Sequence, residues 1–202
     1  MSNKLEQFIG TKIGQAKSLG WFGFSADPPT LAHRAVIDAA LGSGLVQKVV
    51  VFPAGKLPYK DFQTSDWERA DMSELWRSSA QWDDEVIISR FDMSRETAIA
   101  WIDLWKKLND LAPKNNHYFI VGSDQYTQIQ DSWQRGSQLL KHANFIIVPR
   151  QHYPLRNVLR HHHPLNTPAI PGSSTAIRQG NLEQVDEMVG AYILENQLYQ
   201  QR

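Results

Sequence analysis

Residues 19–41 read LGWFGFSADPPTLAHRAVIDAAL, and this stretch decides the fold class. Its opening run, residues 19–24, is apolar without clean alternation, which is typical of a strand covered on both faces. Pro28 and Pro29 then force a turn, and apolar residues at helical spacing follow over residues 31–41. A buried strand that leads directly into a helix predicts the first unit of a parallel α/β sheet.

The same order, an apolar run followed by a helix-like segment, repeats along the chain. It predicts an α/β, Rossmann-like doubly wound parallel sheet of about five strands, with small C-terminal helices. The apolar runs are residues 19–24, 49–52, 86–88, 118–121 and 145–148. The predicted helices are residues 31–41, 65–79, 94–111, 125–140, 174–179 and 182–197. Because ligands of such sheets bind at the carboxyl ends of the strands, the residues just after each run are the candidates for function.

Composition limits both the architecture and the chemistry. The chain has 202 residues, 42% of them hydrophobic, which favours a single domain over residues 1–202 with its core at about 19–199. Lys plus Arg and Asp plus Glu both total 21, and this balance argues against a broad basic surface for nucleic acid or anionic lipid. Cysteine is absent, which excludes disulfides, thiolate metal sites and cysteine nucleophiles. Since no stretch approaches the roughly 20 apolar residues of a membrane span, and residues 1–20 lack a signal-peptide pattern, we expect a cytoplasmic protein.

The turn between the first strand and the first helix is a candidate phosphate site. Thr30 and His33 lie three residues apart, near one face of the first helical turn. Free amides, the helix dipole and the imidazole would all favour negative charge there, although a plain helix start with a structural histidine explains the pattern equally well. Lys60, in the Pro- and Gly-containing loop after the second run, is a candidate phosphate clamp, and a solvated loop lysine is the plainer alternative.

Two later segments carry similar alternatives. Gly122 permits close approach of a ligand to the backbone after the fourth run, and Asp124 could accept hydrogen bonds from a ribose or simply cap the next helix. Trp133 could stack on a flat ring or pack in the core. Near the C-terminus, the hydroxyls of residues 173–175 precede Arg178 at a helix start, which is a compact anion receptor. An ordinary helix cap would explain the hydroxyls but not the arginine.

The loop over residues 151–172 is long, and long loops in compact domains are functional or mobile. It contains His161, His162 and His163, which could suggest a metal site. Three adjacent side chains diverge, however, so a solvated loop is the better interpretation. The sequence therefore assigns no metal-ligating residue.

Taken together, these segments resemble the bacterial nicotinate-nucleotide adenylyltransferases of the nucleotidyltransferase superfamily that carries an H-x-G-H motif. Family sequences have G-G-x-F-D-P-x-H-x-G-H after the first strand and P-x-x-x-P-P-H-K after the second. Later they have G-x-D before a P-x-W element, V-x-R-P-G-Y-P, and I-S-S-T-x-I-R. The matching segments here are residues 23–33, 53–60, 122–124 with Trp133, 148–154 and 172–178. All occur in the same order and at predicted strand–helix junctions, which is hard to obtain by chance.

The resemblance implies transfer of the adenylyl group of ATP to nicotinate mononucleotide, with release of pyrophosphate and with Mg²⁺. Nicotinamide mononucleotide is an alternative acceptor, and a homo-oligomer is left open. No general base is required, because a phosphate monoester is already an anionic nucleophile. The residues that the resemblance makes catalytic are His33, Arg178, Lys60 and Thr30. Those that it places at ATP are Gly23, Ser25, His33, Gly122, Asp124, Ser174, Thr175 and Arg178, and those at the acceptor are Thr97, Trp133 and Arg150.

The chain departs from the family pattern in its first motif. Thr30 stands where the family has its first histidine, Ala32 replaces a glycine, Phe24 replaces the second glycine of the pair, and Ala26 replaces an aromatic residue. A threonine carries no positive charge, and losing one charge-assisted contact could cost a few kcal/mol of transition-state stabilisation. The bulk of Phe24 would be accommodated if its side chain pointed into the core.

These departures keep other functions open. One is a nucleotidyltransferase for another phosphorylated acceptor, and another is a degenerate, non-catalytic nucleotide-binding protein. A purely structural or protein-binding module leaves the placement of the candidate cationic residues unexplained.

Overall fold

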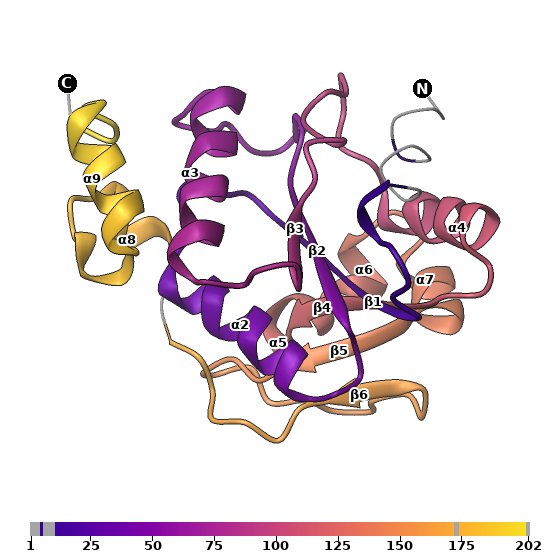
Figure 1. The fold of residues 1–202 in the computed structure, drawn as a ribbon. Helices are drawn as coiled ribbons and strands as arrows, with labels where there is room; N and C mark the ends of the chain where they lie inside the picture. Colours follow the sequence, from indigo (N-terminus) through magenta and orange to yellow (C-terminus); the bar gives the residue numbers. More distant parts are fainter. Residues whose placement is uncertain (1–4, 6–10, 172–173, 201–202) are drawn as a thin grey trace.

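The computed structural model describes residue 5, residues 11–171 and residues 174–200. They form a parallel sheet of six strands in the order β3-β2-β1-β4-β5-β6. The strands are β1 (Ser18–Phe24), β2 (Lys48–Pro53), β3 (Val86–Ile88), β4 (Asn116–Gly122), β5 (Asn144–Val148) and β6 (His162–Pro164). The chain starts in the middle of the sheet, builds one side to β3, then returns to add β4 beside β1 (Figure 1). The reversal between β1 and β4 is the switch point where ligands of open α/β sheets bind.

Helices cover both faces of the sheet. On one face lie α2 (Leu31–Gly42) and α3 (Asp66–Ser79), and α9 (Glu187–Glu195) packs against α3 beside α8 (Ser174–Arg178) (Figure 1). On the other lie α4 (Trp101–Leu111), α5 (Ser123–Tyr126), α6 (Ile129–Ser132) and α7 (Gly136–His142). The short 3₁₀ helix η1 (Leu182–Gln184) links α8 to α9. Among the described residues, no helix combines the length and the apolar character needed to cross a membrane.

The central strands bury both of their faces. In β1, Phe22 and Phe24 pack on the side of α2 and α3, whereas Leu19 and Trp21 pack on the side of α4 and α7. The strands β2, β4 and β5 divide their side chains between the same two clusters. Burial on both faces explains why the sequence shows continuous apolar runs rather than alternation.

The predicted fold class and all five predicted strands are confirmed, but the sheet has six strands rather than about five. The extra strand, β6, lies in the histidine-containing loop, so the solvated loop expected for residues 161–163 is wrong. His162 is buried, its Nδ1 lies 2.6 Å from the hydroxyl of Tyr126, and its Nε2 lies 3.1 Å from the carbonyl oxygen of Leu140. A short edge strand of two histidines and a proline has no apolar run to reveal it.

Three predicted helices differ from the structure. The helix predicted over residues 182–197 is divided into η1 and α9, because Val185 and Asp186 between them are extended, and Asp186 is the N-cap of α9. The helix predicted over residues 94–111 starts only at Trp101, because the preceding loop is fixed by the buried carboxylate of Asp92. That carboxylate accepts hydrogen bonds from the backbone N–H groups of Gly55, at 2.9 Å, and Ile99, at 2.7 Å. The helix predicted over residues 125–140 is divided into α5, α6 and α7, and the break before α7 falls where Arg135 adopts a left-handed conformation with φ of 54°.

Candidate functional site

The turn after β1 is organised by a reciprocal pair of hydrogen bonds between Thr30 and His33. Thr30 is the N-cap of α2, and its Oγ1 accepts from the backbone N–H of His33 at 3.2 Å. In return, Nδ1 of His33 accepts from the backbone N–H of Thr30 at 3.1 Å and lies 2.9 Å from Thr30 Oγ1. This is a capping box in which a histidine takes the usual place of glutamate or glutamine. The fully buried Thr30 therefore holds the ring of His33 in one orientation.

His33 is a neutral hydrogen-bond donor in this arrangement. Burial, followed by the charges of Arg150 and Lys60, lowers its pKa from 6.5 to about 3. Because Nδ1 accepts from the backbone of Thr30, the single proton of the neutral ring is on Nε2. Nε2–H is then the group that can donate to a bound anion.

Phe24 supports this histidine from the core. Its ring centroid lies 4.8 Å from that of His33 and 5.6 Å from that of Trp76, and the side chain belongs to the buried cluster on the α2 and α3 side. The bulk of Phe24 is therefore accommodated in the core. The chain then leaves the strand through Ala26, which is buried and left-handed with φ of 55°.

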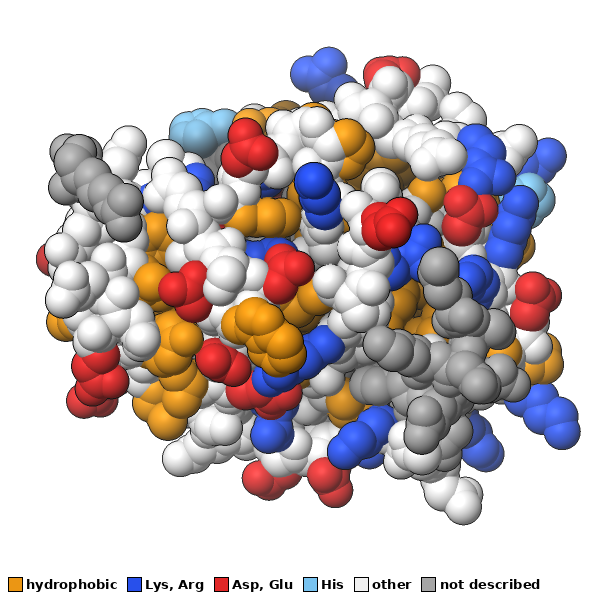
Figure 2. Space-filling model, turned by 90° about the horizontal axis from the view of Figure 1, so that it is seen from above, with side chains coloured by type: hydrophobic (Ala, Val, Ile, Leu, Met, Phe, Trp, Pro, Cys, Tyr) orange, Lys and Arg blue, Asp and Glu red, His pale blue; other side chains and the backbone are white. Residues whose placement is uncertain are grey.

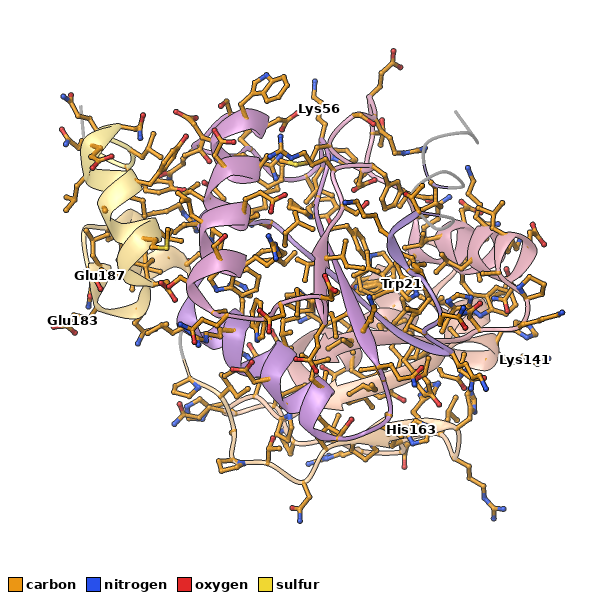
Figure 3. All side chains as sticks on the ribbon, in the orientation of Figure 1. Trp21, Lys56, Lys141, His163, Glu183 and Glu187 are labelled. Carbon is orange, nitrogen blue, oxygen red and sulfur yellow. The ribbon has the colours of Figure 1, made fainter. Side chains whose placement is uncertain are left out.

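Lys60 reaches the same turn from the loop after β2. Its Nζ donates to Oγ of Ser25 at 2.7 Å. Burial lowers the pKa of Lys60, Arg178 and Arg69 lower it further, and the carboxylate of Asp27 opposes them. The other lysine of this loop, Lys56, is exposed and stands above the strands in Figure 3. Of the two loop lysines, Lys60 is the one directed at the candidate site.

Arg178 and Ser174 attach α8 to this turn. Nη1 of Arg178 donates to the carbonyl oxygen of Asp27 at 2.7 Å, and Nη2 donates to Oγ1 of Thr175 at 3.2 Å. Oγ of Ser174 donates to the carbonyl oxygen of Pro28 at 3.0 Å. The structure thus brings His33, Lys60 and Arg178 to one turn, although they are far apart in the sequence. Residue 173 of the predicted anion receptor lies outside the described residues.

A polar cavity of about 770 Å³ opens beside Arg178. Its lining includes Gln63, Glu68, Thr175, Arg178, Gln197 and Tyr199. Figure 2 views the molecule from above and shows cationic and acidic side chains interspersed over this view rather than one broad basic area. A charged ligand would therefore meet a local group of cationic side chains here and not a general positive field.

The end of β4 forms the opposite side of the switch point. A Cβ on Gly122 would lie 2.2 Å from Asp124 Oδ1 and 2.9 Å from Arg150 Cγ, so a larger residue would displace these two side chains. Asp124 Oδ1 lies 4.0 Å from Nε of Arg150, whose own backbone N–H donates to Oγ of Ser123 at 2.9 Å. Because the charge of Arg150 lowers the pKa of His33, this arginine lies on the same side as the cationic group at the turn.

Trp133 and Thr97, which were predicted at the acceptor, have different surroundings. The ring centroid of Trp133 lies 4.9 Å from that of Trp101, which itself packs against Phe119 at 4.8 Å. Gly23, at the end of β1, faces the same aromatic cluster, since a Cβ there would lie 2.9 Å from the ring of Trp101. Thr97 is exposed in the loop before α4. The structure shows no contact that joins Thr97 to Trp133 among the interactions of the described residues.

Arg69 is a residue of the site that the sequence did not reveal. Its side chain is fully buried, and Nη1 donates to the carbonyl oxygens of Ser25 at 2.8 Å and Ala54 at 2.7 Å. The guanidinium lies 3.8 Å from the ring centroid of Phe62. It therefore ties the end of β1 to the end of β2. The available signal was an arginine within the buried stripe of α3, where charged residues are rare unless they are paired.

Comparisons with known proteins bear on the family and the fold. The model of the Cytidylyltransferase-like family matches residues 21–180. A probable nicotinate-nucleotide adenylyltransferase of Helicobacter pylori is 30% identical over 167 residues, which cover 80% of this chain and 91% of that protein. One of Acholeplasma laidlawii is 30% identical over 191 residues, covering 89% and 96%. The solved structure of Plasmodium falciparum nicotinic acid mononucleotide adenylyltransferase complexed with NaAD has the same fold, with a TM-score of 0.81, 23% identity, and coverage of 91% of this chain and 97% of that one.

Proposed function

Since the chain belongs to the nicotinate-nucleotide adenylyltransferases of the cytidylyltransferase-like family, we propose that it transfers the adenylyl group of ATP to nicotinate mononucleotide, a step of NAD biosynthesis. The observation that carries this proposal is the meeting of His33, Lys60 and Arg178 at the turn after β1, beside the switch point of the sheet. A triphosphate is the ligand that such a group of donors fits best.

In the proposed reaction a phosphate oxygen of the acceptor attacks the α-phosphorus of ATP. The new bond forms as the bond between the α-phosphorus and the oxygen bridging to the β-phosphate breaks, and pyrophosphate leaves with that electron pair. The protein has no proton to remove from the nucleophile, so its contribution is alignment and charge stabilisation. Nε2–H of His33 would donate to an α-phosphoryl oxygen, where negative charge builds in the transition state.

Lys60, Arg178 and α8 would hold the rest of the triphosphate. Lys60 and Arg178 supply the positive charge, and Ser174 and Thr175 supply hydroxyls at the start of the helix. Ser25, which accepts from Lys60, would keep that lysine in reach of the phosphates.

The opposite side of the switch point would bind the nucleoside and the acceptor. Gly122 and Asp124 would border the adenosine, as would Gly23. Arg150, whose charge reaches His33, would contact the acceptor phosphate. Trp133 would lie against the pyridine ring, and Thr97 would contact the acceptor from the loop before α4.

Thr30 would contribute through His33 rather than by touching a phosphate. Its side chain is fully buried and engaged with the backbone and ring of His33. Thr30 cannot supply the positive charge of a histidine, so other residues would have to supply it. Arg150 and Lys60 are the cations whose charge lowers the pKa of His33.

Mg²⁺ would arrive with ATP. The described part of the chain contains no group of three His, Asp or Glu side chains that could hold a metal ion. The buried carboxylate of Asp27 already accepts three hydrogen bonds from the protein. This donor set fits a magnesium ion that keeps its waters and is held mainly by the substrate phosphates, where it would neutralise their charge.

A turnover assay with three acceptors tests the proposal. The purified protein is incubated with ATP and Mg²⁺ and with nicotinate mononucleotide, nicotinamide mononucleotide or phosphopantetheine, and pyrophosphate is measured. Release with the first, or with the first two, is the expected result. Release only with phosphopantetheine would assign a different acceptor, and ATP binding without any release would show a non-catalytic nucleotide binder.

A further inference from the structure

The C-terminal end of the described chain returns to the candidate site through Tyr199. The hydroxyl of Tyr199 donates to Oδ1 of Asp27 at 2.7 Å, across 172 positions of sequence. Burial and the neighbouring carboxylate raise the pKa of Tyr199, so its hydroxyl keeps the proton that it donates. The contact is thus an O–H donor to a buried carboxylate, a charge-assisted hydrogen bond.

Asp27 contacts both segments that carry the candidate cations Lys60 and Arg178. Its carboxylate, in a residue that is 1% exposed, also accepts from Thr64 Oγ1 at 2.9 Å and from the backbone N–H of Gln63 at 3.0 Å, which lie just after Lys60. Its backbone carbonyl accepts from Arg178 at 2.7 Å. A shift of Asp27 would therefore move both the loop of Lys60 and the guanidinium of Arg178.

The path of the chain after α9 brings Tyr199 to this position. The helix ends at Glu195, and the backbone N–H of Leu198 donates to the carbonyl oxygen of Ile193 at 3.0 Å. Gln197 and Tyr199 both have positive φ, 54° and 60°, which non-glycine residues rarely adopt. Such a conformation persists only where surrounding contacts determine it, and here Leu198 and Tyr199 pack on the core cluster.

We infer that Tyr199 is a positioning residue for ATP: by holding Asp27, its hydroxyl keeps Arg178 and the loop of Lys60 in the geometry that binds the triphosphate. Tyr199 also lines the cavity beside Arg178, so a polyphosphate bound in that cavity would lie close to it. This inference rests on the proposed function, since it assumes that the cationic group binds ATP.

The test compares two substitutions on the same C-terminal segment. Tyr199→Phe removes the hydroxyl that reaches Asp27, whereas the control Tyr192→Phe removes a hydroxyl of α9 that lies 3.5 Å from Asp71. Binding of MgATP is measured by titration calorimetry without acceptor, alongside the KM for each substrate. Tyr199→Phe is expected to raise the Kd and KM for ATP about fivefold, with the KM for nicotinate mononucleotide unchanged. Tyr192→Phe should leave all of them unchanged.

A second pair of variants tests whether the hydroxyl of Tyr199 acts through Asp27. In an Asp27→Asn background, Tyr199→Phe should add no further change in ATP affinity, because the hydroxyl acts through that carboxylate. Should Asp27→Asn fail to fold by circular dichroism, Thr64→Val removes a different donor to the same oxygen and should weaken ATP binding in the same direction. An unaltered Kd in Tyr199→Phe, or an equal change in Tyr192→Phe, would overturn the inference. The test of Tyr199 measures binding rather than turnover. A wild-type protein that binds ATP without turnover would therefore refute the proposed function, and the inference about Tyr199 could still be tested.

Discussion

The two halves of the candidate site are held in different ways. The half proposed to bind phosphate, around the turn after β1, is fixed by partly buried hydrogen bonds: Thr30 Oγ1 accepts from the backbone N–H of His33, and Arg69 and Arg178 donate to backbone carbonyl oxygens. The half proposed to bind the acceptor consists of an aromatic cluster around Trp133 and a loop that carries the exposed Thr97. We therefore propose a division of work, in which the first half stabilises charge and the second half selects the acceptor. Substitutions in the two halves should therefore separate kcat from the KM of the acceptor.

The largest effect is expected from His33→Ala, in the phosphate half. The variant loses the Nε2–H donor, and turnover should fall by about 10²- to 10³-fold while the Kd for ATP changes much less. The control is His142→Ala on α7, whose ring stacks near Trp105 with centroids 5.6 Å apart, and it should retain activity. Full turnover in His33→Ala would remove the chemical reason for calling this half catalytic.

Arg69→Met tests how firmly the phosphate half is held. The substitution leaves the carbonyl oxygens of Ser25 and Ala54 without their donor, and it should lower the free energy of unfolding by about 3 kcal/mol. Arg77→Met, on the same helix, removes a partly exposed guanidinium that pairs with Glu74 at 3.3 Å, and it should cost less than about 1 kcal/mol. Urea denaturation of both variants provides the measurement, and equal losses would contradict a special role for the buried arginine.

Trp133→Ala tests the acceptor half. Loss of the ring should raise the KM for nicotinate mononucleotide by about tenfold, because one aromatic stacking surface disappears, and the KM for ATP should stay within about twofold. Trp133→Phe keeps an aromatic face and should recover most of the acceptor affinity. If the KM values for both substrates rise together, the two halves are not separable.

The sequence pattern points to the residues of the proposed phosphate half more directly than to those of the proposed acceptor half, for a physical reason. Strands buried on both faces leave continuous apolar runs, and the residues after them are displayed at one edge of the sheet, which locates His33 and Lys60. Arg178 is located by the hydroxyl residues that precede it at a helix start. Arg69 and Tyr199 could not be found in this way, because their partners are backbone oxygens and a carboxylate that approach only in the folded chain. The same holds for β6, whose pairing with β5 depends on neighbours rather than on its own residues.

One titrating group from each half should make the stability of the protein depend on pH, and the two groups should do so in opposite directions. This is the smallest predicted effect. The folded-state pKa of His33, about 3, lies below its ordinary value of 6.5, so between these values the unfolded chain binds the proton and the folded chain does not. The contribution of His33 is therefore complete above pH 6.5 and is lost as the pH falls toward 3.

The pH dependence that Asp92 gives to the stability has the opposite sign. This residue fixes the loop that carries Thr97. Burial raises the pKa of its carboxyl above 3.8 despite the hydrogen bonds from Gly55 and Ile99, so the folded state holds a proton that the unfolded state releases. Its titration should lower stability as the pH rises from 3.8 through the folded-state value.

His33→Gln and Asp92→Asn remove the two titrations. Glutamine is chosen because it keeps the capping box with Thr30. The stability difference between wild type and His33→Gln should increase with pH from 4 to 6, by at most about 1 kcal/mol per unit, and level off above 6.5. The difference for Asp92→Asn should decrease with rising pH just above 3.8. Denaturation curves at a series of pH values give both slopes. If the two slopes had the same sign, the pKa values of His33 and Asp92 would not be shifted in opposite directions from their ordinary values, the first lowered and the second raised, as their surroundings in the folded protein imply.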